Sequence, residues 1–169
     1  MAANVGPRLK ALREFFGFSQ RELAKRAGVP NSAISVIEQE SVSPSVLSLE
    51  KVLNGFPIAL RHFFSIDLEA SAAEPEKGSN LPSGGIAFPL PSDKGVLQFQ
   101  RGASSQSAEI EVPEVPVLLL VLEGGVEVDC LQGSYSLQMG ETLHLVSGSP
   151  YRLKVTTDEA RWLILDAPV

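Results

Sequence analysis

The stretch that most constrains this chain is Gly17–Glu38, whose residues predict two short helices joined by a tight turn. Ser19 and Glu22 have the spacing of a capping box, in which two backbone N–H donors at a helix start are satisfied reciprocally. Gly28 follows where the chain must turn sharply, because glycine adopts a positive φ without a clash at Cβ. Pro30 then opens the second helix.

Each of the two predicted helices has one apolar face. Leu23 and Ala27 face inward in the first, and Ile34 and Ile37 keep the apolar spacing in the second. The other face of the second helix carries short polar side chains, namely Asn31, Ser32 and Ser35. Such a pair of helices can lie against DNA. A hairpin that only packs in a core needs the same cap, turn and contacts, but their joint spacing favours DNA binding.

The stretch resembles the helix-turn-helix of the lambdoid phage repressors and of the xenobiotic-response-element family of bacterial regulators. The matching positions are Gln20, Ala24, Gly28, Ile34 and Ile37. In that family the second helix enters the major groove, and a glutamine at the start of the first helix supports the residues that read base edges. The resemblance implies a DNA-binding surface formed by Gln20, Asn31, Ser32 and Ser35. Asn31 is the sharpest candidate, because an amide can form two hydrogen bonds with adenine.

Basic residues flank this implied surface. Arg21, Lys25 and Arg26 are expected to contact phosphates, which raises affinity and salt dependence without selecting a sequence. Arg13 also lies near the second helix, but the resemblance implies that it forms an internal ion pair with Glu38. Loss of either partner is then expected to damage the fold before it affects DNA contacts.

Charge is distributed unevenly along the chain, whose formal net charge is −6. Residues 1–66 hold eight Lys and Arg against five Asp and Glu, whereas residues 67–169 hold six against 15. This asymmetry is expected if only the N-terminal segment meets phosphate, so the acidic total is compatible with DNA binding.

The N-terminal segment is predicted to be wholly helical. Apolar residues at helical spacing indicate further helices at Pro7–Phe16, Pro44–Asn54 and Ile58–Phe64. Residues 1–66 are therefore predicted to form a five-helix, lambda-repressor-like helix-turn-helix domain. Its phenylalanines are interpreted as a small core, with a stacking platform for single-stranded nucleic acid as the alternative.

The sequence changes character after residue 66, which predicts a two-domain α+β protein. Residues 67–84 are rich in Ala, Ser, Glu, Pro and Gly and are interpreted as a linker. Residues 85–169 contain short segments of alternating polarity separated by Gly, Ser and Asp turn signals. Many short strands with such turns are typical of an antiparallel sandwich or barrel.

The second segment resembles the cupins, which are small jelly-roll barrels. Gly124 matches the glycine that closes the first cupin motif, and Gly140 and Gly148 match two glycines of the second. Val146 replaces the proline of the second motif, and Tyr151 replaces its histidine. The histidines and glutamate of the first motif are also missing from the residues IEVPEVPV at 110–117. Because metal affinity depends on that ligand set, we expect no metal and no cofactor.

A jelly roll without its metal still encloses a cavity, so the resemblance implies a sensor domain. Tyr151 is the leading candidate for binding a small-molecule effector, with Glu114, His144 and Trp162 as further candidates. Regulators that join a repressor-like head to a cupin body are a known group, and this chain resembles the putrescine-utilisation repressors among them. The similarity implies a polyamine or an amino-acid-related effector. Most carboxylates of the segment alternate with apolar residues and are expected to face solvent.

The prediction is a transcriptional regulator, most simply a repressor, that binds a double-stranded operator as a homodimer. Two alternatives remain open: a cupin domain that only dimerises the chain, and a metal-independent cupin enzyme. The chain has no apolar run of membrane-spanning length and no apolar leader, so a cytoplasmic protein is expected, with no membrane contact. Its single cysteine, Cys130, is expected to be a small buried hydrophobe.

Overall fold

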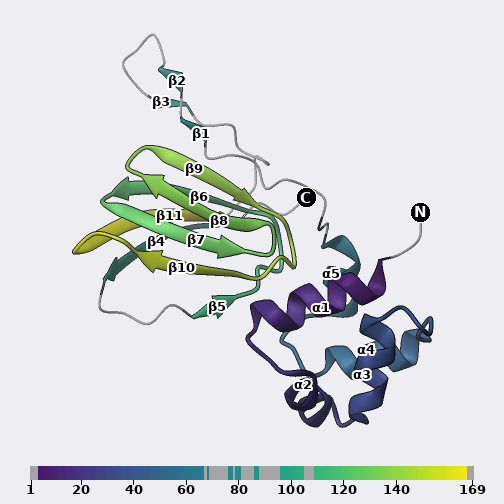
Figure 1. Ribbon diagram of the computed structural model, residues 1–169. Coiled ribbons are helices and arrows are strands. Elements are labelled where there is room, and N and C mark those ends of the chain that lie inside the picture. The colour runs from purple at the N-terminus through teal and green to yellow at the C-terminus, as the bar shows by residue number, and fades with distance from the viewer. Residues whose placement is uncertain are drawn as a thin grey trace. The chain divides into compact units, whose positions relative to one another are not determined.

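A computed structural model of the chain describes residues 4–66, 68, 76–77, 79–80, 86–87, 96–104 and 109–166. The chain forms two compact units, Met1–Leu68 and Glu69–Val169 (Figure 1). The described residues of the first unit form helices and those of the second form β-strands, as the sequence predicts. The division falls close to the predicted end of the helical domain at residue 66.

The described residues of the first unit form five helices. They are α1 (Val5–Phe15), α2 (Gln20–Ala27), α3 (Asn31–Glu38), α4 (Val46–Leu53) and α5 (Leu60–Ser65). Leu9 and Leu12 of α1, Leu23 of α2, Ile34 of α3 and Phe63 of α5 are fully buried. The apolar faces predicted for α2 and α3 therefore form the core of this unit, and α3 lies against both α1 and α2.

The first three helices end in the same way, with a residue of positive φ. Gly17 follows α1 with a φ of 73°, and Gly28 follows α2 with a φ of 66°. Glu40 has a φ of 56° two residues after α3, where its N–H donates to Ile37 O at 3.0 Å. The glycine turn between α2 and α3 is confirmed. The left-handed glutamate was not predicted, because non-glycine residues rarely adopt this conformation.

The predicted capping box is present only in half. Ser19 Oγ accepts a hydrogen bond from Glu22 N at 3.1 Å, as predicted. The Glu22 carboxylate accepts instead from Arg26 Nη2 at 3.3 Å, one turn further along the helix. The start of α2 is therefore fixed by the serine cap, and the glutamate adds a surface ion pair, a kind of contact that contributes little stability.

α1 approaches the end of α3 very closely at Gly6. A Cβ atom at this position would lie 2.6 Å from Ile37 O, 2.7 Å from Glu40 Cγ and 3.0 Å from Glu38 O. Two of these neighbours are backbone atoms, which cannot move aside without displacing α3. Gly6 therefore allows the close packing that fixes α3 against α1.

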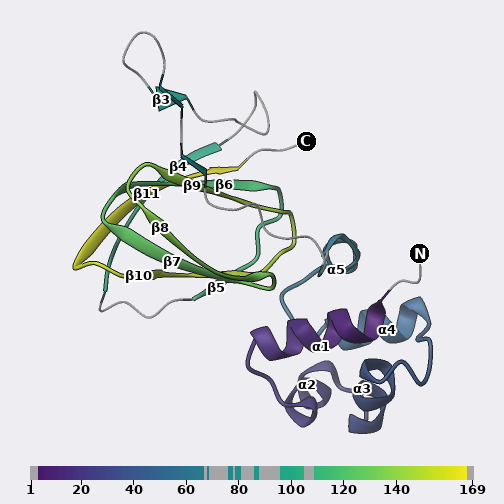
Figure 2. The same ribbon diagram turned by 45° about the horizontal axis from the view of Figure 1, so that its top comes forward.

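The described strands of the second unit form two main sheets. The larger has the order β1 (Glu76–Lys77), β9 (Glu141–Leu145), β6 (Val117–Glu123), β11 (Glu159–Asp166) and β4 (Val96–Ala103). The smaller has the order β5 (Ile110–Glu111), β10 (Tyr151–Val155), β7 (Gly125–Cys130) and β8 (Gly133–Gln138). A separate pair joins β2 (Ser79–Asn80) to β3 (Ile86–Ala87). Figure 2 shows the two main sheets as facing layers.

Alternating residues of the two sheets face each other and form one core. It contains Leu119 of β6, Val128 of β7 and Leu143 of β9, all fully buried. Cys130 lies in this core, as expected, and burial raises the pKa of its thiol. The sequence thus predicted the strands of this antiparallel sandwich from the alternation of polarity.

Gly124 makes a turn between β6 and β7 that no other residue fits. Its φ is 74°, and an added Cβ would clash with the carbonyl oxygen of Glu159 and with Thr157 Oγ1. Both the backbone conformation and the lack of space therefore require glycine here. Gly140 and Gly148 also have positive φ, of 85° and 75°.

The structure describes only parts of the predicted linker at 67–84. Two of these parts are strands: β1 pairs with β9, and β2 pairs with β3. The sandwich therefore includes residues that precede its predicted start at 85. Within the described part of the chain, no helix has the length and apolar character needed to cross a membrane.

We predict that Gly6→Ala lowers the free energy of unfolding of the helical unit by about 1–3 kcal/mol, the usual cost of overpacking. The methyl group would push against the backbone at the end of α3. Urea unfolding of the full chain, followed by helical circular dichroism, measures the change. Lys10→Ala, at an exposed position of the same helix, is the control and should change stability by less than about 0.5 kcal/mol.

Candidate nucleic-acid interface and ligand pocket

A buried ion pair connects α1 to the end of α3. Arg13 Nε donates to Glu38 Oε1 at 2.6 Å, and Arg13 Nη2 donates to Glu38 Oε2 at 3.0 Å. The Glu38 side chain is only 3% exposed and that of Arg13 is 11% exposed. Arg13 Nη1 also donates to Phe18 O at 2.8 Å, which ties the loop before α2 to the same guanidinium.

This geometry agrees with the internal pair expected for Arg13. The hydrogen bond to Glu38 is the main cause that raises the pKa of Arg13 above its ordinary value, and burial opposes it. Two nitrogen atoms of the guanidinium donate to Glu38 and the third donates to Phe18 O, so the Arg13 side chain is held in one orientation and links α1 to α3.

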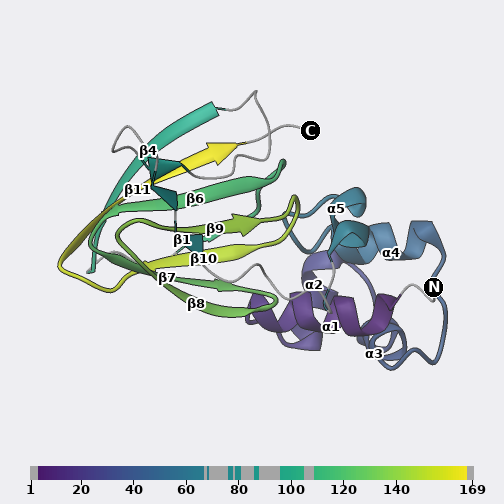
Figure 3. The same ribbon diagram turned by 90° about the horizontal axis from the view of Figure 1, so that it is seen from above.

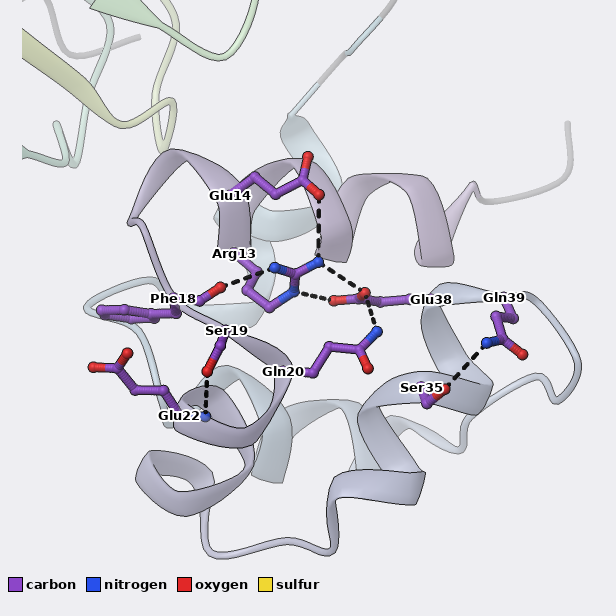
Figure 4. A network of polar contacts seen from close by, with 9 residues as sticks. All are labelled: Arg13, Glu14, Phe18, Ser19, Gln20, Glu22, Ser35, Glu38 and Gln39. Atoms are coloured by element: carbon purple, nitrogen blue, oxygen red, sulfur yellow. Dashed lines mark hydrogen bonds and ion pairs between the residues drawn. The ribbon is translucent and has the colours of Figure 1, made fainter.

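Gln20 joins the same network from α2. Its Nε2 donates to Glu38 Oε2 at 2.8 Å, so one carboxylate receives hydrogen bonds from both α1 and α2 (Figure 4). Gln20 is half-buried at the start of α2, which is where a support for α3 has to stand. The structure therefore shows Gln20 holding the end of α3, while its place on a DNA-binding surface stays a prediction.

The remaining predicted base-reading residues lie on α3. Asn31 and Ser32 are exposed in its first turn, and Ser35 is half-buried one turn later. Ser35 Oγ accepts a hydrogen bond from Gln39 Nε2 at 3.1 Å (Figure 4). Asn31, Ser35 and Gln39 follow one another at intervals of four residues and so form a polar stripe along the helix.

Sequence reasoning missed Gln39. It is exposed, it carries an amide of the kind that reads adenine, and its position four residues after Ser35 was visible in the sequence. It was overlooked because the apolar spacing of α3 ends at Ile37, and Gln39 is the cap residue just beyond the helix.

Two of the predicted phosphate contacts share one exposed side of α2. Arg21 and Lys25 are exposed and lie one helical turn apart. Arg26 is placed differently, because its guanidinium carbon lies 4.1 Å from the centre of the Phe18 ring and its Nη2 pairs with Glu22. The structure therefore brings together Arg21 and Lys25, and gives Arg26 intramolecular partners.

The outer face of α3 carries no uncompensated negative charge. The helix has no acidic residue in its first turn, and Glu38 is its single carboxylate. Because Glu38 is paired with Arg13 and buried, it presents little charge to a polyanion. Helix α3 is thus positioned by a charged network on its inner side and presents a neutral polar surface on its outer side.

The β unit contains a pocket between the ends of its two sheets. Gln98 of β4, Val117 of β6, and Ile164 and Asp166 of β11 line one side. Tyr151 of β10, Glu111 of β5 and the loop at 112–115, which includes Glu114, line the other. The volume is about 260 Å³, and the described lining holds three carboxylates and no Lys or Arg.

Tyr151 is at the centre of the hydrogen bonds in this pocket. Its side chain is buried, and its hydroxyl donates to Glu111 Oε2 at 2.5 Å. Burial, that hydrogen bond, and the charges of Glu111 and Asp166 all raise the pKa of Tyr151 far above its usual range. The phenol of Tyr151 therefore stays protonated. On the opposite wall of the pocket, Gln98 Nε2 donates a hydrogen bond to Asp166 Oδ2 at 3.1 Å.

Two of the four predicted effector contacts, Tyr151 and Glu114, line this pocket. Trp162 is buried in the same core but is not part of the lining. His144 pairs in register with Leu118, on the face of the sheet opposite to the core residues Leu119 and Leu143. The structure therefore does not bring His144 to the pocket, because alternate residues of a strand point to opposite faces.

Glu111 and Asp166 are pocket residues that sequence reasoning missed. Glu111 is exposed, as its alternation with Ile110 predicts, but it also stands opposite Tyr151 in the β5–β10 register, which the sequence did not indicate. Asp166 lies at the end of β11, where no local signal indicates a pocket. Among the described residues, no group of three or more His, Cys, Asp or Glu side chains has an arrangement that could hold a metal ion.

Comparison with known proteins gives a match within the helical unit. The helix-turn-helix family HTH_3 matches residues 9–63. A transcriptional regulator of Escherichia coli (strain K12), described as "HTH-type transcriptional regulator PuuR", is 43% identical over 72 residues, which cover 43% of this chain and 35% of the regulator. The chain thus matches about a third of the length of this relative, and a PuuR from Shigella flexneri matches in the same way.

Solved structures also align with the chain. An HTH_3 family transcriptional regulator from Vibrio cholerae aligns over 99% of this chain and 97% of its own, with 24% identity and a TM-score of 0.38. A cupin 2 conserved barrel domain protein from Leptotrichia buccalis aligns over 48% of this chain and 38% of its own, with 16% identity and a TM-score of 0.41.

We predict that Arg13→Ala lowers the free energy of unfolding by about 3–5 kcal/mol, because it leaves the Glu38 carboxylate buried without its cation. The double substitution Arg13→Met with Glu38→Leu removes both charges and should cost clearly less than the single one. Chemical unfolding of both variants tests the comparison. An Arg13→Ala chain as stable as the unmodified protein would show that the pair does not hold α3.

Proposed function

We propose that the chain is a sequence-specific, DNA-binding transcriptional regulator, acting as a repressor, whose β domain binds a small effector. The match of residues 9–63 to the helix-turn-helix family HTH_3 supports this proposal. The observation that carries this proposal is the network around Glu38. It holds α3 by contacts from both α1 and α2, while Asn31 and Ser32 at the start of α3 and Gln39 just beyond its end stay exposed. A rigid helix with a free polar face is what base recognition in the major groove requires.

The residues divide into two kinds of DNA contact. Asn31, Ser32 and Ser35 are assigned to base edges, with Gln20 as their support and Gln39 as an added candidate. Arg21 and Lys25 are assigned to phosphates, since they are exposed and lie one helical turn apart on α2. Base contacts select a sequence, whereas phosphate contacts supply affinity on any sequence.

A single α3 offers few base contacts, so the regulator is proposed to act as a homodimer. Two copies related by a twofold axis would place their α3 helices in successive major grooves, about 34 Å apart, on a near-palindromic operator. Both copies then contribute to the discrimination between the operator and other DNA.

The pocket beside Tyr151 is proposed as the effector site. Its described lining combines three carboxylates, Glu111, Glu114 and Asp166, with the Tyr151 hydroxyl. Ammonium groups donate several hydrogen bonds and pair with carboxylates, so a small amine such as a polyamine fits this lining better than an organic acid or a sugar. The effector changes DNA binding only if it prefers one geometry of the dimer, since equal affinity for both shifts nothing.

We predict that Asn31→Ala weakens binding to the selected operator by about 1–3 kcal/mol and leaves binding to unrelated DNA nearly unchanged. The operator is first obtained by selection of bound duplexes from a random pool. Dissociation constants on both DNAs are then measured at one fixed salt concentration.

Two further variants make the result specific. Lys25→Ala should weaken binding to both DNAs by a similar factor and reduce the salt dependence. Asn54→Ala changes an exposed asparagine that follows α4 and should leave both constants unchanged. Equal weakening on both DNAs by Asn31→Ala would exclude the base-reading role of Asn31. If the selection enriches no sequence, the proposal that the chain is a sequence-specific regulator would be overturned.

We predict that Glu111→Gln lowers the affinity for diamines about tenfold or more, because a charge-assisted hydrogen bond contributes about 1.5–3 kcal/mol. The full chain is screened by thermal shift against diamines, monoamines, amino acids, organic acids and sugars. Glu127→Gln is the matched control, since Glu127 alternates on β7 with the core residues Val126 and Val128. A folded chain that shows no shift with any of these compounds would favour a β domain that only dimerises the protein.

A further inference from the structure

An apolar patch lies on the outer face of the larger sheet. Ala160, Trp162 and Ile164 of β11 point into the core, so the alternate residues, among them Leu163, point outward. Leu163 pairs with Phe99 of β4 on one side and with Leu120 of β6 on the other. These three side chains therefore form one row across adjacent strands, and Figure 3 shows β4, β11 and β6 side by side.

The patch is open to solvent in the single chain. Phe99 is 74% exposed and Leu122, next to the row, is 37% exposed. The register of β6 and β11 shifts between Arg161 and Trp162, which leaves Leu122 without a partner strand position. Exposed aromatic and leucine side chains gathered on one face are typical of protein interaction sites.

Charged side chains of both signs border the patch. Arg101 pairs with Glu159 at 2.7 Å, and Arg161 pairs with Glu123 at 3.2 Å. All four side chains are more than half exposed. The border thus holds equal numbers of arginines and glutamates, so a second copy turned by a twofold axis can set each arginine against a glutamate of its neighbour.

We infer that this outer face, formed by Phe99, Leu120, Leu122 and Leu163 with its border of two arginines and two glutamates, is where a second copy of this chain docks. The inference rests on the proposed function, because a regulator that reads paired half-sites needs a twofold contact. Self-complementary charge is the property that an isologous interface demands, and it favours this occupant over a partner of one net charge. The aromatic ring of Phe99 supplies the buried anchor that such interfaces use.

The test is the oligomeric state of the full chain, without DNA, by sedimentation velocity at micromolar concentrations. The unmodified chain should be a dimer, and Phe99→Asp and Leu122→Asp should each be monomers with unchanged circular dichroism. Leu47→Asp is the matched control, because Leu47 is a 70% exposed leucine of α4, in the helical unit and so not part of the patch. A monomeric unmodified chain, or dimers of both patch variants, would overturn the inference.

Charge reversal gives a second, independent readout. Arg161→Glu leaves one arginine against three glutamates at the border and should weaken the dimer about tenfold or more. Arg161→Glu combined with Glu123→Arg restores equal numbers and should restore the dimer. A dimer that responds to neither change would contradict the assignment of this face.

DNA binding separates failure of this inference from failure of the proposed function. If both hold, Phe99→Asp keeps the affinity of one copy for a single half-site and loses the gain in affinity from a second half-site. If Phe99→Asp retains the gain in affinity from a second half-site, the twofold contact lies elsewhere and the proposed function still holds. If the unmodified chain shows no sequence-specific DNA binding, the proposed function would instead be overturned.

Discussion

The position of α3 depends on the carboxylate of Glu38. Arg13 reaches it from α1, Gln20 reaches it from α2, and the same arginine binds Phe18 O in the connection between those helices. A charge buried to this degree is tolerated only when its hydrogen bonds are satisfied, so the helices must meet in one arrangement for the network to form. Gly6 adds a steric condition to this electrostatic one, because only a residue without Cβ allows α1 so close to the backbone at Ile37 and Glu38.

The parts of the fold that could be predicted are those with local causes. The cap at Ser19, the turn at Gly28 and the alternation along the β-strands all act within a few residues, and each was found from the sequence. Contacts that depend on register could not be found in this way. Tyr151 meets Glu111 across 40 residues, and the pairing of β5 with β10 that joins them is set by the packing of the whole sandwich.

The residues of the candidate sites also separate into those with local signals in the sequence and those placed by tertiary contacts. Asn31 and Ser32 were predictable because a short polar face on a helix is visible in sequence, whereas the contact that places Gln20 against Glu38 required the positions of three helices. In the β unit, the alternation of side chains along a strand decides which residues can reach the pocket. His144 is an attractive residue by chemistry, but its neighbours Leu143 and Leu145 are in the core, so it must point to the other face. Asp166 reaches the pocket for the corresponding reason, being two residues after the core residue Ile164.

The free energy needed to recognise an operator explains why the proposed contact between two copies, on the outer face of the larger sheet, matters for DNA binding. The polar stripe of α3 offers the amides of Asn31 and Gln39 and the hydroxyl of Ser35, and one good bidentate contact discriminates between bases by about 1–3 kcal/mol. Regulators separate their operators from other DNA by roughly 4–10 kcal/mol, so the two amides of one stripe reach only the lower part of that range. Doubling the number of recognition helices raises the discrimination without any new side chain, provided that the two copies are held together. In the proposed regulator, specificity as well as effector binding therefore depends on the β domain, which is proposed to hold the two copies together.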